Sequence, residues 1–310
     1  MRVLYHFGGE VIERARNEFP DLEHIEVPMD GELDDGVSGE ILFTLGRDSP
    51  NLRTLLGRGV EWVHSLSTGV DHFPLDALDG RPLTCSRGAS AIPISEWCMT
   101  QMLAFEKHVP DEWRSSPPEM WNFPRRPLGS LHGARLAIVG LGAIGQLLAT
   151  QAMAFGMDVR AMRRTSKPSP VTGVEIVTDI ASLVADADHI VIAAPATRAT
   201  SRLIDASVFA AMKPGVHLVN VARGTLVDHD ALRAALDDGT VALASLDTSD
   251  PEPAPADSWL WEHERVHLSP HVSWNWPRAW EMVAESFVQN IARYVAHEPL
   301  TDLVDTVEGY

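Results

Sequence analysis

Short apolar runs alternate with amphipathic stretches along almost the whole chain. The periodic segments 144–155 and 229–237 have the apolar spacing of helices. The runs between such segments, rich in Val, Ile, Leu and Ala, predict buried strands at residues 3–7, 41–45, 62–66, 136–139, 159–162, 190–194, 217–221 and 242–246. Strands that alternate with helices in this way predict an α/β fold with doubly wound parallel sheets, covered by helices on both faces.

One segment, residues 110–131, interrupts this alternation. It holds two tryptophans and, within eleven residues, the prolines Pro117, Pro118, Pro124 and Pro127. Prolines at this density stop helices and central strands, so we interpret the segment as an ordered loop that leads into a second domain. Helices predicted near 94–108 and 278–297 would carry the chain across and back. We therefore expect a substrate (catalytic) domain from residues 1–98 and 284–310, with an NAD(P)-binding Rossmann domain at 99–283 inserted into it.

Charge and composition exclude several classes of partner. The chain carries 25 Lys and Arg against 43 Asp and Glu, a net charge of −18, which would repel nucleic acid and anionic membranes. No apolar run approaches the roughly 18 residues that span a bilayer, and the first residues lack the apolar core of a signal peptide. The two cysteines, Cys85 and Cys98, indicate no disulfide framework and fit a reducing compartment, so we expect a cytoplasmic protein.

A glycine-rich turn indicates the cofactor. The strand at 136–139 runs directly into Gly140-Leu141-Gly142-Ala143-Ile144-Gly145, and a helix follows. Glycines allow the tight turn and a close approach of the backbone to a pyrophosphate, while the helix N-terminus offers free N–H groups to that anion. Since a second strand follows at 159–162, the context favours a dinucleotide site over a structural turn.

The end of that second strand bears on which dinucleotide is bound. Sites that prefer NAD usually place an acid there to hold the ribose 2′-hydroxyl. Here Arg163 and Arg164 follow Met162 instead, and Asp158 comes too early to reach the ribose. Arginine suits a 2′-phosphate by charge and donor geometry, so we favour NADP(H) over NAD(H). The alternative is that both arginines are merely solvated and that NAD is held by other contacts.

Three residues in the last third of the chain are candidates for catalysis. Arg223 lies in Asn-Val-Ala-Arg-Gly, Glu252 in Asp-Pro-Glu-Pro and His271 in Ser-Pro-His, each just after a predicted strand. A fixed cation can hold a carboxylate, a histidine can move a proton, and an acid can orient and tune that histidine. Each residue alone would be an ordinary surface group, but beside a dinucleotide site the set indicates reversible reduction of a 2-oxo acid.

Together these motifs resemble the D-isomer-specific 2-hydroxyacid dehydrogenases. Within that family the chain is most similar to short NADPH-linked glyoxylate/hydroxypyruvate reductases. The resemblance rests on residues 66–71, 88–96, 131–133, 220–228, 247–253, 269–271 and 298–305. It implies a flavodoxin-like substrate domain that contains the inserted Rossmann domain. It also implies a homodimer and a small 2-oxo or 2-hydroxy acid as substrate.

The resemblance also implies roles for individual residues. Backbone N–H groups of Thr68 and Gly69 would hold the substrate carboxylate with Arg223, which would also polarise the carbonyl. His271 would donate the proton, and Glu252 would orient His271 and favour its protonated form. Asp247 would face the nicotinamide carboxamide. The other cofactor contacts expected beyond the glycine-rich turn and the two arginines are Ala194, Pro195, Val221 and His271 itself.

Some features depart from the family pattern or leave alternatives open. Thr248-Ser249 replaces the usual Val-Phe, and the bulky Trp274 and Trp276 follow His271 where small residues are common; the sequence leaves the role of these tryptophans open. Glu252 argues against formate dehydrogenases, whose histidine pairs with glutamine. A dinucleotide-sensing, co-repressor-like protein without significant turnover and a dehydrogenase of another small anion, such as phosphite, remain alternatives. No metal site is predicted.

Overall fold

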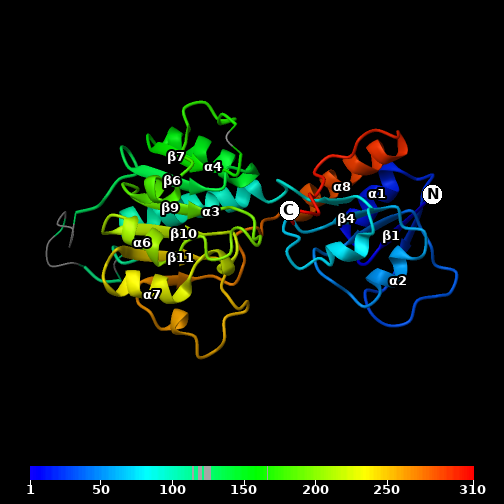
Figure 1. Cartoon of the computed structure of the whole chain (residues 1–310), viewed down its shortest axis with the longest axis horizontal. Coiled ribbons are helices and arrows are strands. Elements are labelled where there is room, and N and C mark those ends of the chain that lie inside the picture. Colours follow the sequence, from blue (N-terminus) through cyan, green and yellow to red (C-terminus); the bar gives the residue numbers. More distant parts are fainter. Residues whose placement is uncertain (114, 118–120, 122–126, 166) are drawn as a thin grey trace. The chain divides into compact units, whose positions relative to one another are not determined.

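The computed structural model describes the chain from Met1 to Tyr310 except for residues 114, 118–120, 122–126 and 166. It divides into two compact units (Figure 1): Met1–Ser90 with Asn275–Tyr310, and Ala91–Trp274. The predicted α/β fold with two parallel sheets is confirmed. Pro118 and Pro124 of the expected ordered loop lie outside the described residues. Among the helices that are described, none is both long and apolar enough to cross a membrane.

The unit boundaries lie before the positions expected from the sequence. The expected crossings after residue 98 and at residue 284 fall inside the helices α3 (Ala91–Lys107) and α8 (Ala279–Val295). Helix α3 packs on α4 (Ala143–Ala154) within the second unit, and α8 packs on α1 (Glu10–Glu18) within the first. Each long helix therefore belongs wholly to one unit, because its apolar face is buried there.

The first unit is built on a five-stranded parallel sheet. Helices α1 and α8 cover one face, while α2 (Leu52–Leu56) and the 3₁₀ turn η1 (Leu75–Leu78) cover the other. The strand order is β2 (Glu23–Glu26), β1 (Arg2–Tyr5), β3 (Ile41–Thr44), β4 (Trp62–Ser65) and β5 (Leu83–Cys85). This 2-1-3-4-5 order is that of flavodoxin-like folds.

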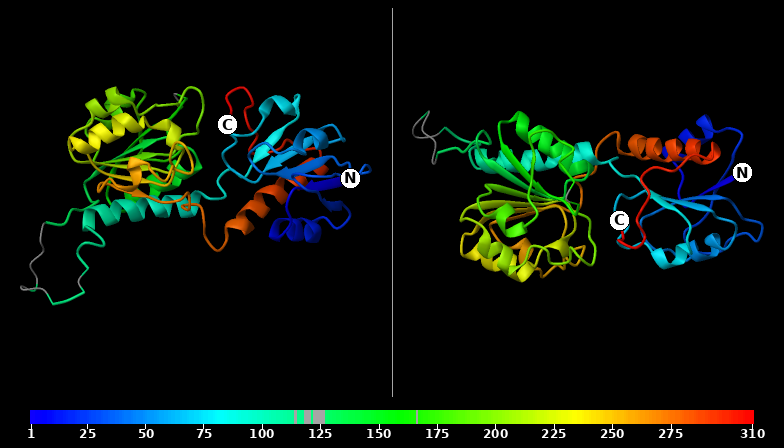
Figure 2. Two further views of the ribbon diagram at one scale, coloured as in Figure 1. Left: turned by 90° about the horizontal axis from the view of Figure 1, so that it is seen from below. Right: turned by 45° about the horizontal axis from the view of Figure 1, so that its top comes forward.

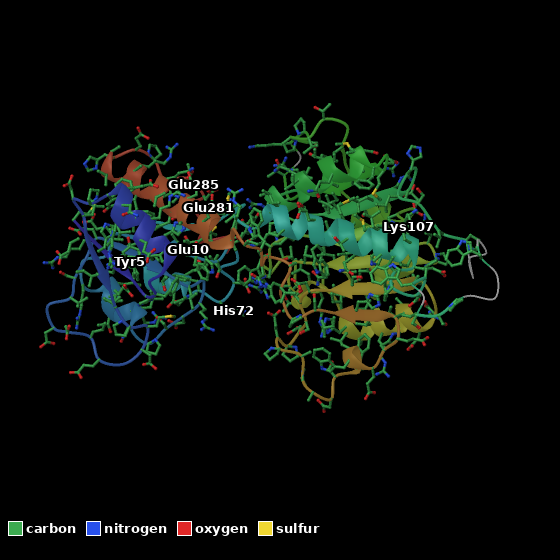
Figure 3. The ribbon with its side chains drawn as sticks, turned by 180° about the vertical axis from the view of Figure 1, so that it is seen from behind. Tyr5, Glu10, His72, Lys107, Glu281 and Glu285 are labelled. Atoms are coloured by element: carbon green, nitrogen blue, oxygen red, sulfur yellow. The ribbon has the colours of Figure 1, made fainter. Side chains whose placement is uncertain are left out.

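Two helices from opposite ends of the chain meet on this sheet. Figure 3 labels Glu10 on α1 and Glu285 on α8, and Arg14 of α1 forms an ion pair with Glu285. Beneath them, the ring of Phe287 packs on Phe43, with 4.8 Å between centroids. The C-terminal helix therefore completes the core that the first 90 residues begin.

The second unit contains a seven-stranded parallel sheet. Its strand order is β12 (Val266–Leu268), β11 (Val241–Leu246), β10 (Val216–Asn220), β9 (His189–Ile192), β6 (Arg135–Val139), β7 (Asp158–Met162) and β8 (Glu175–Ile176). In chain order this is a Rossmann arrangement with one added edge strand. The order reverses between β6 and β9, so the carboxyl ends of these two strands flank the point where such sheets bind ligands.

Helices cover both faces of this sheet (Figure 2). Leu136 and Ile138 of β6 pack under α3 and α4, whereas Ala137 and Val139 face the other layer. That layer consists of α5 (Ile180–Val184), α6 (Ala206–Ala211) and α7 (His229–Asp237). Because both faces are buried, the strands are apolar at consecutive positions.

Candidate active site

The glycine-rich turn joins β6 to α4 by a path that only glycine allows. Gly140 has φ +105°, a left-handed conformation that favours glycine. A Cβ atom on Gly140 would lie 2.6 Å from the backbone nitrogen of Ala194, and one on Gly145 would lie 2.2 Å from the carbonyl oxygen of Gly140. The turn is therefore packed directly against the residues that follow β9, and the helix against the strand.

The N-terminus of α4 is open to an anion. Helices α5, α6 and α7 begin after Asp179, Asp205 and Asp228, whose carboxylates accept hydrogen bonds from the first backbone N–H groups. Helix α4 begins after Gly142, which supplies no side-chain cap, and a Cβ there would meet nothing within 4 Å. The first N–H groups of α4, which include those of the expected contacts Ala143 and Ile144, suit a bound pyrophosphate.

The other residues expected to contact the cofactor lie at the same edge of the sheet. Ala194 and Pro195 follow β9, Val221 follows β10, and the two arginines follow β7. Arg163 is half-buried and its guanidinium donates to the carbonyl of Pro168 at 3.3 Å, while Arg164 is exposed. Two cations thus stand where an NAD site usually has an acid.

The catalytic candidates are positioned by three adjacent strands. Arg223 lies just beyond β10, Glu252 in the loop beyond β11 and His271 just beyond β12. These strands are neighbours and parallel, so their carboxyl ends share one edge of the sheet. The three residues therefore lie along the same edge of the sheet.

His271 and Glu252 form a direct pair. Nδ1 of His271 lies 2.6 Å from Oε1 of Glu252, and the two side chains are 37% and 40% exposed. Because Nδ1 is engaged by the carboxylate, Nε2 is the ring nitrogen that can exchange a proton with a substrate. Such a pair has the geometry of an oriented general acid–base.

Arg223 sits in a turn held by Asn220. The amide Nδ2 of Asn220 donates to the carbonyl of Arg223 at 2.9 Å, and its Oδ1 accepts from the N–H of Ala222 at 3.0 Å. A Cβ on Gly224 would lie 2.0 Å from the carbonyl carbon of Ser249, so the loop after β10 packs against the loop after β11. Asn220 belongs to the motif at 220–228, but its sequence does not predict this role, because the role depends on the turn that the side chain closes.

Asp247 anchors the loop that carries His271. Its side chain is buried, and its carboxylate accepts from Ser269 Oγ at 2.6 Å and from the N–H groups of Val272 and Ser273, both at 2.9 Å. These bonds hold the residues on both sides of His271. The expected contact of Asp247 with a carboxamide stays a prediction. The anchoring role has one sequence signal, the hydroxyl of Ser269 two residues before His271.

In the first unit, the loop with Thr68 and Gly69 follows β4. Thr68 Oγ1 donates to the carbonyl of Ser86 at 2.9 Å, and a Cβ on Gly46 would lie 2.5 Å from the carbonyl oxygen of Gly69. Below this loop His64 is fully buried and bonds to the hydroxyls of Thr84 and Ser86. Burial lowers the pKa of His64 to about 3, so its ring is neutral at physiological pH.

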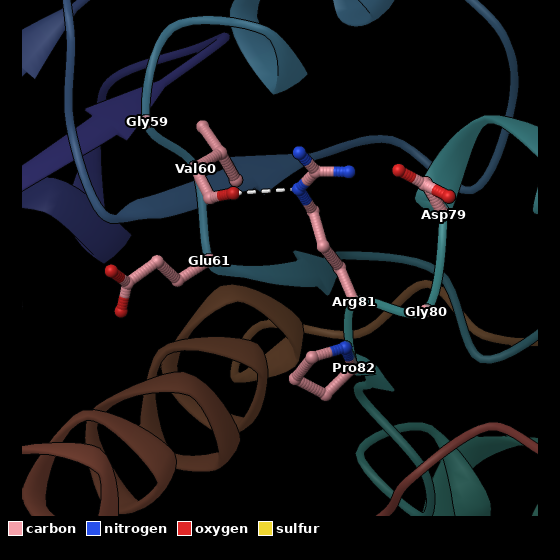
Figure 4. Close-up of a pocket in the computed structure, with 7 residues that line it drawn as sticks. All are labelled: Gly59, Val60, Glu61, Asp79, Gly80, Arg81 and Pro82. Atoms are coloured by element: carbon pink, nitrogen blue, oxygen red, sulfur yellow. Dashed lines mark hydrogen bonds between the residues drawn. The ribbon is translucent and has the colours of Figure 1, made fainter.

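A shallow hollow in the first unit lies away from this loop (Figure 4). It is lined by residues that precede β4 and β5, at the amino ends of the strands: Gly59, Val60, Glu61, Asp79, Gly80, Arg81 and Pro82. Arg81 donates to the carbonyls of Val60, Leu78 and Leu56 at 2.8, 2.9 and 3.2 Å. Arg81 thus connects three backbone segments by hydrogen bonds and has a structural role. Parallel sheets bind ligands at the carboxyl ends of their strands, which is the edge opposite this hollow.

Comparison with known proteins identifies the family. The NAD-binding domain of the D-isomer specific 2-hydroxyacid dehydrogenases matches residues 99–273, which is more than half of the chain. The chain therefore belongs to this family, as the motifs predict. The matched segment contains the glycine-rich turn and all three catalytic candidates.

Solved structures similar to the chain include two with bound dinucleotides. A D-isomer specific 2-hydroxyacid dehydrogenase from Xanthobacter autotrophicus, in complex with NADPH and MES, is 26% identical with a TM-score of 0.86, covering 100% of this chain and 99% of that one. An NADPH-dependent glyoxylate/hydroxypyruvate reductase from Sinorhizobium meliloti, in complex with NADP and sulfate, is 25% identical with a TM-score of 0.82 and the same coverage.

Among curated proteins, similar sequences include D-3-phosphoglycerate dehydrogenases. The one from Bacillus subtilis is 30% identical over 247 residues, which is 78% of this chain and 47% of that protein. The one from Mycobacterium tuberculosis is 31% identical over 265 residues, which is 84% of this chain and 48% of that protein. The chain thus spans about half the length of these relatives.

Proposed function

We propose that the protein reduces a small 2-oxo acid to the D-2-hydroxy acid with NADPH as the hydride donor. The observation that carries this proposal is the His271–Glu252 pair, 2.6 Å apart, on the sheet edge that also holds Arg223 and the open N-terminus of α4. The D configuration follows from the family. The proposal is restricted to substrates whose carboxylate a fixed guanidinium can bind.

Each residue of the site has a separate role in the proposed reaction. A bound nicotinamide supplies the hydride, which adds to the carbonyl carbon. Arg223 binds the substrate carboxylate and polarises the carbonyl oxygen, a bidentate role that lysine cannot take over without loss. His271 donates the proton from Nε2 to the oxygen as negative charge develops there, and Glu252 holds the opposite ring nitrogen. By resemblance, backbone N–H groups of Thr68 and Gly69 also bind the carboxylate.

Preference for NADP(H) over NAD(H) is supported by the end of β7. Arg163 and Arg164 offer charge and paired donors to a 2′-phosphate. The two similar structures named above were solved with NADPH or NADP.

Initial rates test the proposal. Oxidation of NADPH and of NADH is followed with glyoxylate, hydroxypyruvate, pyruvate, a bulkier 2-oxo acid and 3-phosphohydroxypyruvate. We expect the highest kcat/KM with NADPH and with glyoxylate or hydroxypyruvate. A higher kcat/KM with 3-phosphohydroxypyruvate than with the unphosphorylated acids would contradict the substrate assignment. A higher kcat/KM with NADH than with NADPH would contradict the cofactor assignment. Dinucleotide binding without turnover of any acid would favour the sensing role or another anion.

We also propose that the enzyme is a cytoplasmic homodimer. The dimer is supported by the family resemblance. The location is supported by Cys85 and Cys98, which are both buried free thiols. Light scattering of the purified protein tests the dimer, since a mass of one 34.0 kDa chain would contradict it.

A further inference from the structure

The backbone at His271 has a conformation that needs outside support. Its φ is +54°, in the left-handed region that residues other than glycine rarely adopt. Such a residue persists only where its surroundings hold it, and it often lies at a functional site. The contacts that hold this turn therefore bear on the orientation of the imidazole.

Asp247 provides the inner support of the turn. The N–H of His271 donates to the backbone carbonyl of Asp247 at 3.0 Å, and the next two N–H groups donate to its carboxylate. These bonds hold the N–H groups of three consecutive residues. The N–H of Val272 lies in the same peptide plane as the His271 carbonyl, so Asp247 holds this plane at one end and leaves the carbonyl oxygen at the other end to another contact.

Trp274 provides that contact. Its indole Nε1–H donates to the carbonyl oxygen of His271 at 2.9 Å, across three residues of chain. The side chain is partly exposed, so water could satisfy the indole N–H equally well. The indole instead closes the turn at the His271 carbonyl, at the opposite end of the peptide from the N–H that Asp247 binds.

We propose that Trp274 is a positioning residue for His271. By fixing the His271 carbonyl, the indole holds the left-handed turn and keeps Nδ1 at 2.6 Å from Glu252, with Nε2 directed to the substrate. Without the indole N–H, the peptide between His271 and Val272 is held only at its N–H, by Asp247, so the left-handed turn is less restrained and the imidazole loses its alignment. This inference rests on the proposed function, in which His271 is the proton donor.

The test compares two tryptophans two positions apart. Trp274→Phe removes the indole N–H that holds the turn. Trp276→Phe is the matched control, because its buried Nε1 has no hydrogen-bond partner among the described residues. A misplacement of about 1 Å costs up to roughly 10²-fold in rate, so we expect Trp274→Phe to lower kcat at least about tenfold while KM for NADPH stays the same. The control should lower kcat less than about twofold.

A double variant separates positioning from general stability. If Trp274 acts through His271, Trp274→Phe has no further effect on kcat once His271 is alanine. An equal fall in both backgrounds would overturn the inference, as would a Trp274→Phe enzyme with normal kcat. Wild-type activity that survives His271→Ala would instead count against the proposed function.

The position of the His271 ring can also be tested without measuring activity. In histidine-labelled protein the ring signal of His271, assigned through His271→Ala, reports its environment in the absence of substrate. We expect the signal to shift or broaden in Trp274→Phe and to stay in place in Trp276→Phe. An unchanged His271 signal in Trp274→Phe would overturn the positioning role, whatever the substrate proves to be.

Discussion

At the residue scale, the proposed chemistry depends on a pair that water can reach. His271 and Glu252 are each more than a third exposed, so their attraction alone is screened and worth little. Their alignment must come from the loops that carry them. Those loops are held by hydrogen bonds of Asp247 and Asn220 and by the packing of Gly224 against the backbone of Ser249. These contacts keep the exposed His271–Glu252 pair aligned.

The role of Glu252 can be divided into charge and orientation. Glu252→Gln keeps an oxygen that can accept from Nδ1 of His271 but loses the charge, whereas Glu252→Ala loses both. We expect kcat to fall about tenfold in the glutamine variant and roughly 10²-fold or more in the alanine variant, with KM for NADPH unchanged. Equal kcat in the two variants would show that the orienting hydrogen bond contributes nothing.

Replacement of the two arginines tests the cofactor preference. In Arg163→Ala/Arg164→Ala we expect KM for NADPH to rise about ten- to a hundredfold, because charge-assisted bonds to the 2′-phosphate are lost. KM for NADH should change less than about twofold, since NADH lacks that phosphate. Arg58→Ala, at a partly exposed arginine of the first unit, is the control. A parallel rise for both dinucleotides would contradict the assignment.

The sequence predicts the catalytic residues of the site, but it does not predict the contacts that position them. Arg223, Glu252 and His271 stand out because each follows a strand in a motif of its own. The contacts of Trp274 with the His271 carbonyl and of Asp247 with two backbone N–H groups depend on a left-handed turn. No periodicity indicates such a turn at a residue other than glycine.

At the element scale, close approaches of backbone to backbone position the loops. Gly46→Ala is expected to displace the Thr68–Gly69 loop, because the new Cβ would lie 2.5 Å from the carbonyl oxygen of Gly69. KM for the 2-oxo acid should rise about tenfold or more, as when one charge-assisted bond is lost, while KM for NADPH is unchanged. Gly36→Ala, where a Cβ meets nothing within 4 Å, should match the wild type. An unchanged KM in Gly46→Ala would remove this loop from substrate binding.

The pattern of apolar runs predicts central elements better than edges. Strands such as β6 and β10 are buried on both faces, so they contain apolar residues at consecutive positions, at 136–139 and 218–219. The edge strands β2 and β8 contain glutamates, and β8 has only two residues, so the pattern does not predict them. Their pairing is decided by neighbouring strands, β1 and β7, and not by their own residues.

At the scale of the whole molecule, buried histidines link stability to pH. Burial lowers the pKa of His64 to about 3 and that of His6 to about 4, and it lowers the pKa of His217 as well. Below pH 6.5 the unfolded chain therefore binds protons that the folded chain does not, and folding becomes less favourable as pH falls. Each such histidine destabilises the fold by up to roughly 1.4 kcal/mol per pH unit in this window.

Urea unfolding at pH 7 and pH 5 measures this effect. We expect a lower free energy of unfolding at pH 5, and a smaller difference between the two pH values in His64→Asn, which removes one titrating group. Above pH 5 carboxylates with lowered pKa, such as Asp188, stay ionised and do not contribute. Equal stability at both pH values would contradict the assignment of neutral buried histidines.

The proposed reaction determines which atom of the product receives the hydride. NADPH deuterated at the transferable position of nicotinamide C4 is incubated with the enzyme and hydroxypyruvate, and the product is analysed by mass spectrometry and chiral separation. We predict one deuterium on C2 of the D-2-hydroxy acid, since the hydride adds to the carbonyl carbon while His271 protonates the oxygen. A product without deuterium at C2, or an L-2-hydroxy acid, would contradict the proposed reaction.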